Sequence, residues 1–137
     1  MYLRGRARRG PTFGEVLLTH AVARLALHPE ITNIQASWVK LGPDGVRAAL
    51  AAGVNDLGGT LMNESISRAA GSEWGQELPP ERMEALIRAA GRVPQQRTTL
   101  YRDVAAERTL QSFGAAALAP VVQTPLRRAE RASQPAH

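Results

Sequence analysis

The chain has 137 residues and a formal net charge of +5, with 44% hydrophobic and 21% charged residues, a composition that permits a buried core and does not indicate disorder. Because it contains no cysteine, it can form neither a disulfide nor a cysteine-ligated metal site by itself. No apolar run reaches the roughly 20 residues of a membrane helix, which predicts a soluble, cytoplasmic protein with no membrane partner.

Basic residues are concentrated at the start of the chain, where MYLRGRARRG contains four arginines. Clustered arginines can bind the phosphate groups of nucleic acids. Here glycines interrupt the cluster and Pro11 follows it, so no amphipathic targeting helix is expected. No aromatic RNA-binding pattern lies beside it. We therefore expect a loop that faces solvent or a substrate, and no nucleic-acid partner.

The first predicted elements alternate between helix and strand. Residues 14–28 carry apolar side chains at helical spacing and are followed by Pro29, so we expect a helix there. Residues 31–39, ITNIQASWV, are few and rich in β-branched and aromatic side chains, which predicts a strand. Pro43 lies near the start of a second helix, which runs to Gly53, a residue suited to the left-handed turn that ends a helix.

The alternation continues along the rest of the chain. Residues 54–59 are predicted as a strand, 64–71 as a short helix and 81–91 as a longer helix preceded by two prolines. A third strand is expected at 97–101, RTTLY, and a further helix at 104–119.

Strands separated by helices, without two-residue hairpin turns, predict parallel βαβ crossovers and an α/β fold. About three parallel strands are few for an open sheet, because both edges would remain unpaired. A complete (βα)₈ barrel needs roughly 250 residues. We therefore expect residues 1–122 to form the C-terminal portion of a TIM-type barrel with intervening helices, and residues 123–137 to be a disordered tail.

Polar side chains occur along each predicted strand, where a filled barrel would carry Val, Ile or Leu. Alternation aligns them on shared sides of the strands: Gln35 with Ser37, Asp56 with Gly58, and Arg97 with Thr99 and Tyr101. Buried without partners, such groups cost several kcal/mol each. The pattern therefore predicts a cavity for a polar ligand.

The sequence GVNDLGGTLMNES suggests where such a ligand would lie. Gly58 and Gly59, at the end of the second strand, would let a ligand approach the backbone, and Thr60, Asn63 and Glu64 can donate or accept hydrogen bonds at the rim. Alternatively, the glycines only permit a tight turn and Asn63 only caps a helix. The segment matches neither GxxxxGK nor GxGxxG, so it is not a phosphate-binding loop.

No catalytic triad or metal site is predicted, and the catalytic residues cannot be named from these patterns. His20 and His28 are eight residues apart, unlike the i, i+4 pair of a zinc-binding helix. We expect structural roles for both histidines.

Four segments together resemble a known family: YLRGRARRGPT, NIQASWVKLGPDGVRAAL, AGVNDLGGTLMNESISRAAG and ELPPERMEALIRAAGRVPQQRTTLY. They are similar to the C-terminal part of the radical S-adenosylmethionine enzymes that make 7,8-didemethyl-8-hydroxy-5-deazariboflavin, the FO synthases. Within that family, the likeness is to the half that joins tyrosine to a pyrimidine. It covers residues 2 to 126 in uninterrupted order, which makes it more specific than a single motif.

The resemblance implies a radical S-adenosylmethionine barrel with a 4Fe-4S cluster, held by a CxxxCxxC loop near its beginning. It also implies the transfer of a 4-hydroxybenzyl group from tyrosine to 5-amino-6-(D-ribitylamino)uracil, as a step of deazaflavin coenzyme biosynthesis. Since this chain has no cysteine, it cannot bind the cluster. We therefore expect a fragment of such an enzyme, inactive alone, whose partner is the missing N-terminal portion of the barrel.

Two alternatives remain at the level of sequence. One is a fragment of a related radical S-adenosylmethionine enzyme of the aminofutalosine route to menaquinone, which GGTLMNESISRAAG disfavours. The other is a stand-alone basic binding module derived from the barrel.

By position, the resemblance places two groups of residues at the S-adenosylmethionine and substrate pocket. Gln35, Ser37 and Trp38 would face the nucleoside or substrate, and a second group would face tyrosine or the uracil and its ribityl hydroxyls: Asn55, Asp56, Gly58, Gly59, Thr60, Asn63 and Glu64. We expect Asp56 to accept hydrogen bonds from the tyrosine ammonium or the pyrimidine. Alternatively, Asp56 only pairs with Arg97 on the neighbouring strand.

Overall fold

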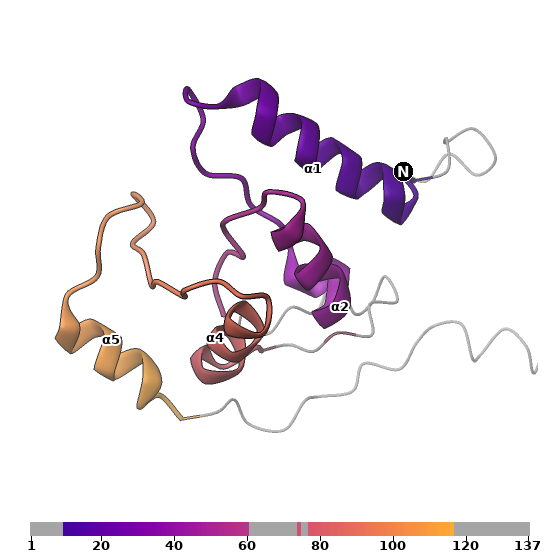
Figure 1. Cartoon of the computed structure of the whole chain (residues 1–137). Helices are drawn as coiled ribbons and strands as arrows, with labels where there is room; N and C mark the ends of the chain where they lie inside the picture. Colours follow the sequence, from indigo (N-terminus) through magenta and orange to yellow (C-terminus); the bar gives the residue numbers. More distant parts are fainter. Residues whose placement is uncertain (1–9, 61–73, 75–76, 117–137) are drawn as a thin grey trace, which may run out of the picture.

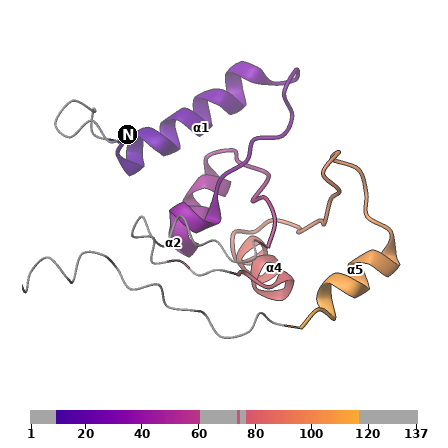
Figure 2. The same cartoon turned by 180° about the vertical axis from the view of Figure 1, so that it is seen from behind.

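The computed structural model describes residues 10–60, 74 and 77–116. Within these residues the secondary structure comprises helices α1 (Phe13–Leu27), α2 (Trp38–Ala51), α4 (Pro80–Ala89) and α5 (Ala106–Phe113), together with two isolated β-bridges. The helices follow one another in space, because α1 contacts α2, α2 contacts α4 and α4 contacts α5 (Figures 1 and 2). The helix predicted at 64–71 and the tail at 123–137 lie outside the described residues.

Helix α1 begins and ends close to the predicted positions. Thr12 Oγ1 accepts a hydrogen bond of 3.2 Å from the Glu15 amide, and the Glu15 carboxylate accepts one of 2.7 Å from the Thr12 amide. This capping box satisfies two amides that lack helical partners. After Leu27 the backbone becomes extended at His28, before Pro29. The predicted helix is therefore confirmed, and local sequence accounts for both of its ends.

The strand predicted at 31–39 is wrong for its last residues, because helix α2 begins at Trp38. Trp38 and Val39 are adjacent residues of the first helical turn and both are buried, as are Val46 and Ala49 beyond the kink at Gly42. A short apolar run does not distinguish a strand from the first turn of a buried helix. Gly42 (φ +66°) interrupts the helix just before Pro43, at the place where the sequence predicted a helix start.

The first two predicted strands are reduced to one parallel bridge between Gln35 and Asp56. The Ala36 amide donates to the Asp56 carbonyl at 2.9 Å, and the Asn55 amide donates to the Ile34 carbonyl at 3.1 Å. The predicted parallel direction of these segments is thus confirmed, although neither extends into a strand in the described residues.

The third predicted strand, 97–101, is wrong. Arg97 forms an antiparallel bridge with Asp103, and the Thr98 amide donates to the Arg102 carbonyl at 2.9 Å. Tyr101 adopts a positive φ of 57°, which turns the chain back on itself and prevents an extended run. The segment is a tight turn and adds no strand beside Asp56.

The buried core lies between α1 and α4 and is built by one continuous stretch of chain. All nine buried apolar residues of the described part fall between residues 34 and 57: Ile34, Ala36, Trp38, Val39, Val46, Ala49, Leu50, Val54 and Leu57. Half-buried side chains of α1 and α4, among them Leu17, Met83 and Ile87, pack against this core. Helix α2 is therefore the central element on which the others rest.

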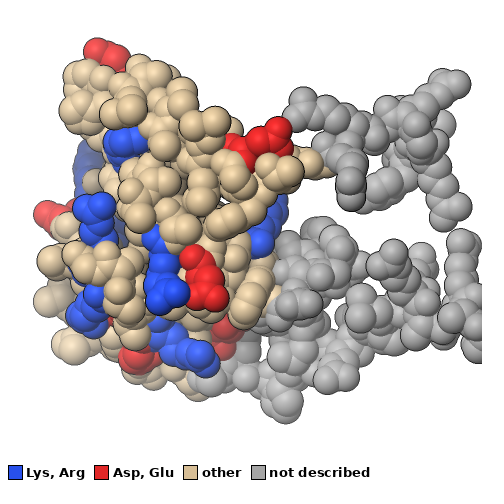
Figure 3. Space-filling view, turned by 45° about the vertical axis from the view of Figure 1, so that its right-hand side comes forward, with Lys and Arg blue, Asp and Glu red and all other residues tan. Residues whose placement is uncertain are grey.

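The molecular surface mixes both signs of charge. On the face shown in Figure 3, Lys and Arg side chains are interspersed with Asp and Glu. Several large apolar side chains of α1 are exposed, Leu18 to 64% and Leu25 to 83%. No helix in the described ranges has the length and apolar character needed to span a bilayer.

Candidate functional site

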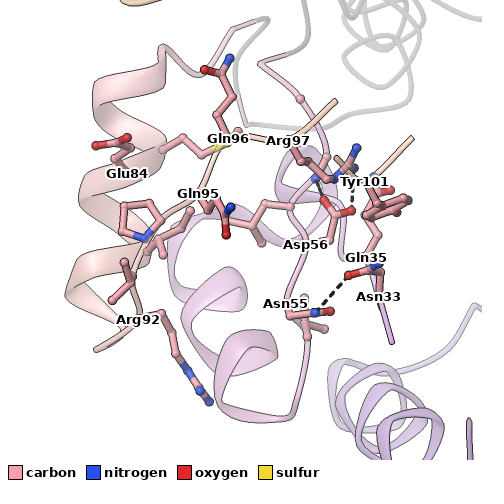
Figure 4. Close-up of a pocket in the computed structure, with 18 of the residues that line it drawn as sticks. Asn33, Gln35, Asn55, Asp56, Glu84, Arg92, Gln95, Gln96, Arg97 and Tyr101 are labelled. Carbon is pink, nitrogen blue, oxygen red and sulfur yellow. Dashed lines mark hydrogen bonds and ion pairs between the residues drawn. The ribbon is translucent and has the colours of Figure 1, made fainter. Parts of the chain in front are cut away.

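A hollow of about 1160 Å³ lies where the parallel bridge ends, and Figure 4 shows the side chains around it. Its wall comes from the segments before and after α2, from α4, from the turn at 97–103 and from parts of α1 and α5. Its polar residues include Gln35, Asn55, Asp56, Thr60, Arg97 and Tyr101.

Asp56 lies at the centre of this wall and is the buried charged residue of the described chain, with 8% of its surface exposed. Its Oδ1 accepts a hydrogen bond of 2.7 Å from the Gly58 amide, and its Oδ2 lies 2.6 Å from Arg97 Nη2 in an ion pair. A buried carboxylate is costly without such partners. The pairing with Arg97 that the sequence offered as an alternative is therefore present.

Arg97 is held from three directions. Besides the ion pair with Asp56, its Nη1 donates to the Thr98 carbonyl at 3.0 Å, and its guanidinium carbon lies 4.2 Å from the centre of the Tyr101 ring. Cation–π contacts of this kind favour a fixed orientation of the guanidinium over the ring. Figure 4 shows Asp56, Arg97 and Tyr101 grouped at one side of the hollow.

Tyr101 is linked to the same carboxylate. A hydrogen bond to Asp56 raises the pKa of the Tyr101 phenol above its usual 10.0, and desolvation and the negative charge of Asp56 act in the same direction, while the charge of Arg97 opposes them. The raised pKa reflects the position of the phenol beside the buried carboxylate.

At Gly58 the backbone is closely approached by a side chain of the protein itself, and the predicted approach of a ligand stays a prediction. Gly58 has a φ of +75°, and a Cβ added there would lie 2.6 Å from Gln35 Nε2. Any larger residue would be strained and would displace Gln35. The neighbouring Gly59 uses its carbonyl to accept a hydrogen bond of 2.9 Å from Trp38 Nε1.

Asn55 faces the opposite side of the bridged segment from Asp56, as alternation requires. Its Oδ1 accepts from Arg24 Nη2 at 2.7 Å and from the Ile34 amide at 2.9 Å. Its Nδ2 donates to the Thr32 carbonyl at 3.1 Å and to Asn33 Oδ1 at 3.3 Å (Figure 4). Asn55 therefore joins α1 to the bridged segments through contacts within the protein.

The structure brings together part of the predicted set. Six predicted residues line the hollow: Gln35, Asn55, Asp56, Gly58, Gly59 and Thr60. Trp38 is instead buried in the core, and Ser37 precedes α2 without capping it through its side chain. Asn63 and Glu64 lie outside the described residues. Roles in binding substrate or S-adenosylmethionine remain predictions for all of them.

Sequence reasoning did not include Arg97 and Tyr101 among the site residues. The signal was present, since the two had been aligned on one side of the predicted third strand. The structure brings them to Asp56 by a turn and not by a strand.

The chain does not fit an iron–sulfur cluster. It has no cysteine, and the part that the structure describes contains no group of three His, Cys, Asp or Glu side chains placed to hold a metal ion. The described residues around the hollow offer hydrogen-bonding groups and one ion pair.

Comparison with known proteins identifies the protein family of the chain. The family model of the CofH/MqnC C-terminal region matches residues 3–109. This range includes Asp56, Arg97 and Tyr101. The chain belongs to this family.

Three relatives show how similar the chain is to individual proteins and how much of each it matches. The chain is 55% identical over 97 residues to the 5-amino-6-(D-ribitylamino)uracil–L-tyrosine 4-hydroxyphenyl transferase of Archaeoglobus fulgidus, a match that covers 71% of this chain and 28% of that protein. It is 56% identical over 104 residues to the same-named transferase of Methanopyrus kandleri, covering 76% of this chain and 28% of that protein. It is 53% identical over 108 residues to the FO synthase of Streptomyces avermitilis, covering 79% of this chain and 12% of that protein.

The chain therefore spans only about an eighth to a quarter of the length of these relatives. These three relatives are named as the transferase or as FO synthase, and none of the three bears the name of an aminofutalosine enzyme. No solved structure matches the chain.

Proposed function

We propose that this chain is the C-terminal part of the tyrosine-coupling half of an FO synthase. In the complete enzyme it would supply one wall of the pocket in which a 4-hydroxybenzyl group passes from tyrosine to 5-amino-6-(D-ribitylamino)uracil. The observation that carries this proposal is the 53% identity to FO synthase over 108 residues, supported by the polar hollow within the family range. The remainder of the enzyme would have to hold the cluster and its S-adenosylmethionine.

Within such an enzyme, the parallel bridge between Gln35 and Asp56 would mark the carboxyl ends of two neighbouring barrel strands. Active sites of TIM barrels lie at that end of the strands. The hollow at this point is consistent with the arrangement, because its wall contains hydrogen-bonding side chains and an ion pair. The role of this chain would be to bind and orient the two organic substrates, which can supply a large part of an enzymatic rate enhancement.

The test uses a chimaera: the FO synthase of Streptomyces avermitilis in which residues 3–109 of this chain replace the matching segment. We expect the chimaera to form the deazaflavin product from tyrosine and the pyrimidine. Asp56→Asn should lower product formation by about tenfold to a hundredfold, because the charge-assisted contact of the Asp56 carboxylate with Arg97, worth about 1.5–3 kcal/mol, is lost.

The matched control is Asp44→Asn, since Asp44 forms a surface ion pair with Arg47 and its side chain is 93% exposed. This control should retain full product formation. A chimaera without product would contradict the proposed function. An Asp56→Asn variant as active as the control would instead contradict a role for Asp56 in the pocket.

A further inference from the structure

We propose that Arg97 is the substrate-facing donor of this hollow, that it binds an oxygen acceptor of a small planar substrate group, and that Asp56 and Tyr101 are positioning residues acting through it. This inference rests on the proposed function and deepens it. The sequence favoured Asp56 as the residue in contact with substrate, and the contacts of Asp56 in the structure point to its neighbour instead.

The carboxylate of Asp56 is already engaged within the protein. Its Oδ1 is bonded to the Gly58 amide and its Oδ2 lies against Arg97, and only 5% of its side chain is exposed. A substrate ammonium would have to displace Arg97 to reach it, leaving a second charge without its partner. Asp56 is therefore placed to hold the loop at Gly58 and the guanidinium of Arg97.

Arg97 is the member of the cluster that can reach a ligand. Its side chain is 30% exposed and lines the hollow. A guanidinium carries five N–H donors in a rigid plane, and the contacts to Asp56 and to the Thr98 carbonyl use one nitrogen each. The Tyr101 ring, 4.2 Å away, supports the face of that plane. Such a guanidinium is fixed before ligand arrives, which lowers the entropic cost of binding.

Other arginines around the hollow are less suited to this role. Arg24 donates hydrogen bonds to the Gly53 carbonyl, the Thr32 carbonyl and Asn55 Oδ1, at 2.7, 2.8 and 2.7 Å, so its donors already have partners within the protein. Arg92 makes one long contact of 3.4 Å with the Leu50 carbonyl and has no ring or carboxylate to orient it among the described residues. Arg102 also lines the hollow. Among these four arginines, Arg97 is the one for which the described residues show both an ion pair and a stacked ring.

The chemistry of the pair defines the ligand class. Because Asp56 neutralises the charge of Arg97, the site does not require an anion, and a carbonyl oxygen or a carboxylate can each accept from the remaining N–H groups. Tyrosine offers a carboxylate and the uracil offers carbonyl oxygens. Both substrates therefore offer an oxygen acceptor. Measuring KM for each substrate separately identifies which of the two binds Arg97.

The experiment measures KM for tyrosine and for the pyrimidine in the chimaera, each with the other substrate saturating. Arg97→Lys keeps the charge and loses the planar fork, so we expect the KM of one substrate to rise by about tenfold to a hundredfold. Tyr101→Phe keeps the ring and removes the hydroxyl, so the same KM should rise by about twofold to tenfold. Arg47→Lys, an exposed arginine on α2, is the matched control and should shift neither KM.

A rise confined to tyrosine identifies the carboxylate as the ligand, and a rise confined to the pyrimidine identifies its carbonyl groups; both outcomes support the proposal. Unchanged KM values in Arg97→Lys, in an active chimaera, overturn it and leave the proposed function standing. If Arg97→Lys does not fold, Tyr101→Phe decides, and unchanged KM values there overturn the proposal. An inactive wild-type chimaera overturns the proposed function and this inference with it.

Discussion

Helix α1 and the segment from residue 34 to 57 lie in contact but are stabilised in different ways. None of the 15 residues of α1 is buried, whereas the 34–57 segment contains all nine buried apolar residues of the described chain. Local capping specifies α1, and three hydrogen bonds from Arg24 attach it to the rest. Burial of side chains specifies α2 and its flanking segments. A helix can thus be strongly encoded by its ends while contributing little to the core.

The largest expected effect comes from truncating a buried side chain of the 34–57 segment, compared with an exposed side chain of α1. Leu50 is 4% exposed and Leu25 is 83% exposed. In the chimaera, Leu50→Ala should lower the local free energy of opening around α2 by about 2–5 kcal/mol, because it leaves a cavity. Leu25→Ala should change the local free energy of opening of α1 by no more than about 0.5 kcal/mol. Hydrogen exchange measures both, and a large loss for Leu25→Ala would show that another part of the enzyme covers α1.

Arg24→Ala tests how α1 is attached. The variant removes three hydrogen bonds between α1 and the loops at 32 and 53–55, so we expect amide protection in α1 to fall by about 1–3 kcal/mol. Protection in α2 should change little. Arg47→Ala, which removes an exposed ion pair, is the matched control. Equal losses in α1 and α2 would show that the two regions open as one unit.

Thr12→Ala addresses the cap of α1 alone. Loss of the capping box should cost about 1 kcal/mol, measured as faster exchange of the first-turn amides of α1. Thr19→Ala serves as a control within the same helix, because the Thr19 hydroxyl bonds only back to the Glu15 carbonyl. If Thr12→Ala leaves the first turn unchanged, the local account of α1 fails.

The smallest effect concerns pH. A hydrogen bond from the Thr12 amide, followed by one from the Thr12 hydroxyl, lowers the pKa of Glu15 below its usual 4.5. A lowered pKa in the folded state means that the stabilisation is present above pH 4.5 and disappears as the pH falls through the folded pKa. Exchange in the first turn of α1 should therefore accelerate in that range. Glu15→Gln removes the titrating carboxylate and should abolish this dependence, and a dependence that persists would point to another carboxylate.

Local signals in the sequence predict helices here better than strands. The helix at 13–27 was predicted from apolar spacing and Pro29, and the helix at 80–89 from paired prolines. Both lie within about two residues of the predicted bounds, although the capping residues Thr12 and Glu15 were not used as a signal. Trp38 and Val39 were assigned to the wrong element because apolar runs of this length fit either structure. The 97–101 segment failed because the positive φ of Tyr101 has no signal comparable to glycine in the sequence.

The site was predictable only in part. Alternation along residues 54–59 correctly separated Asp56 from Asn55, whose side chains have different partners. The sequence pattern offered the Asp56–Arg97 pair as an alternative, but it could not show that partners within the protein also occupy Asn55, because these partners lie 21 to 31 residues away along the chain. Long-range pairing of this kind depends on the tertiary structure.

The adjacent amide and carboxylate of Asn55 and Asp56 have a consequence for the register of the parallel pairing. A slip of one residue would exchange the faces of the two side chains. A carboxylate would then lie against the Thr32 carbonyl and Asn33, where the Asn55 amide now donates, and Arg97 would face an uncharged amide. Both exchanges are unfavourable, so the order of these two residues selects one register, together with the burial of Val54 and Leu57. Exchanging Asn55 and Asp56 would retain the composition of the chain and remove that selection.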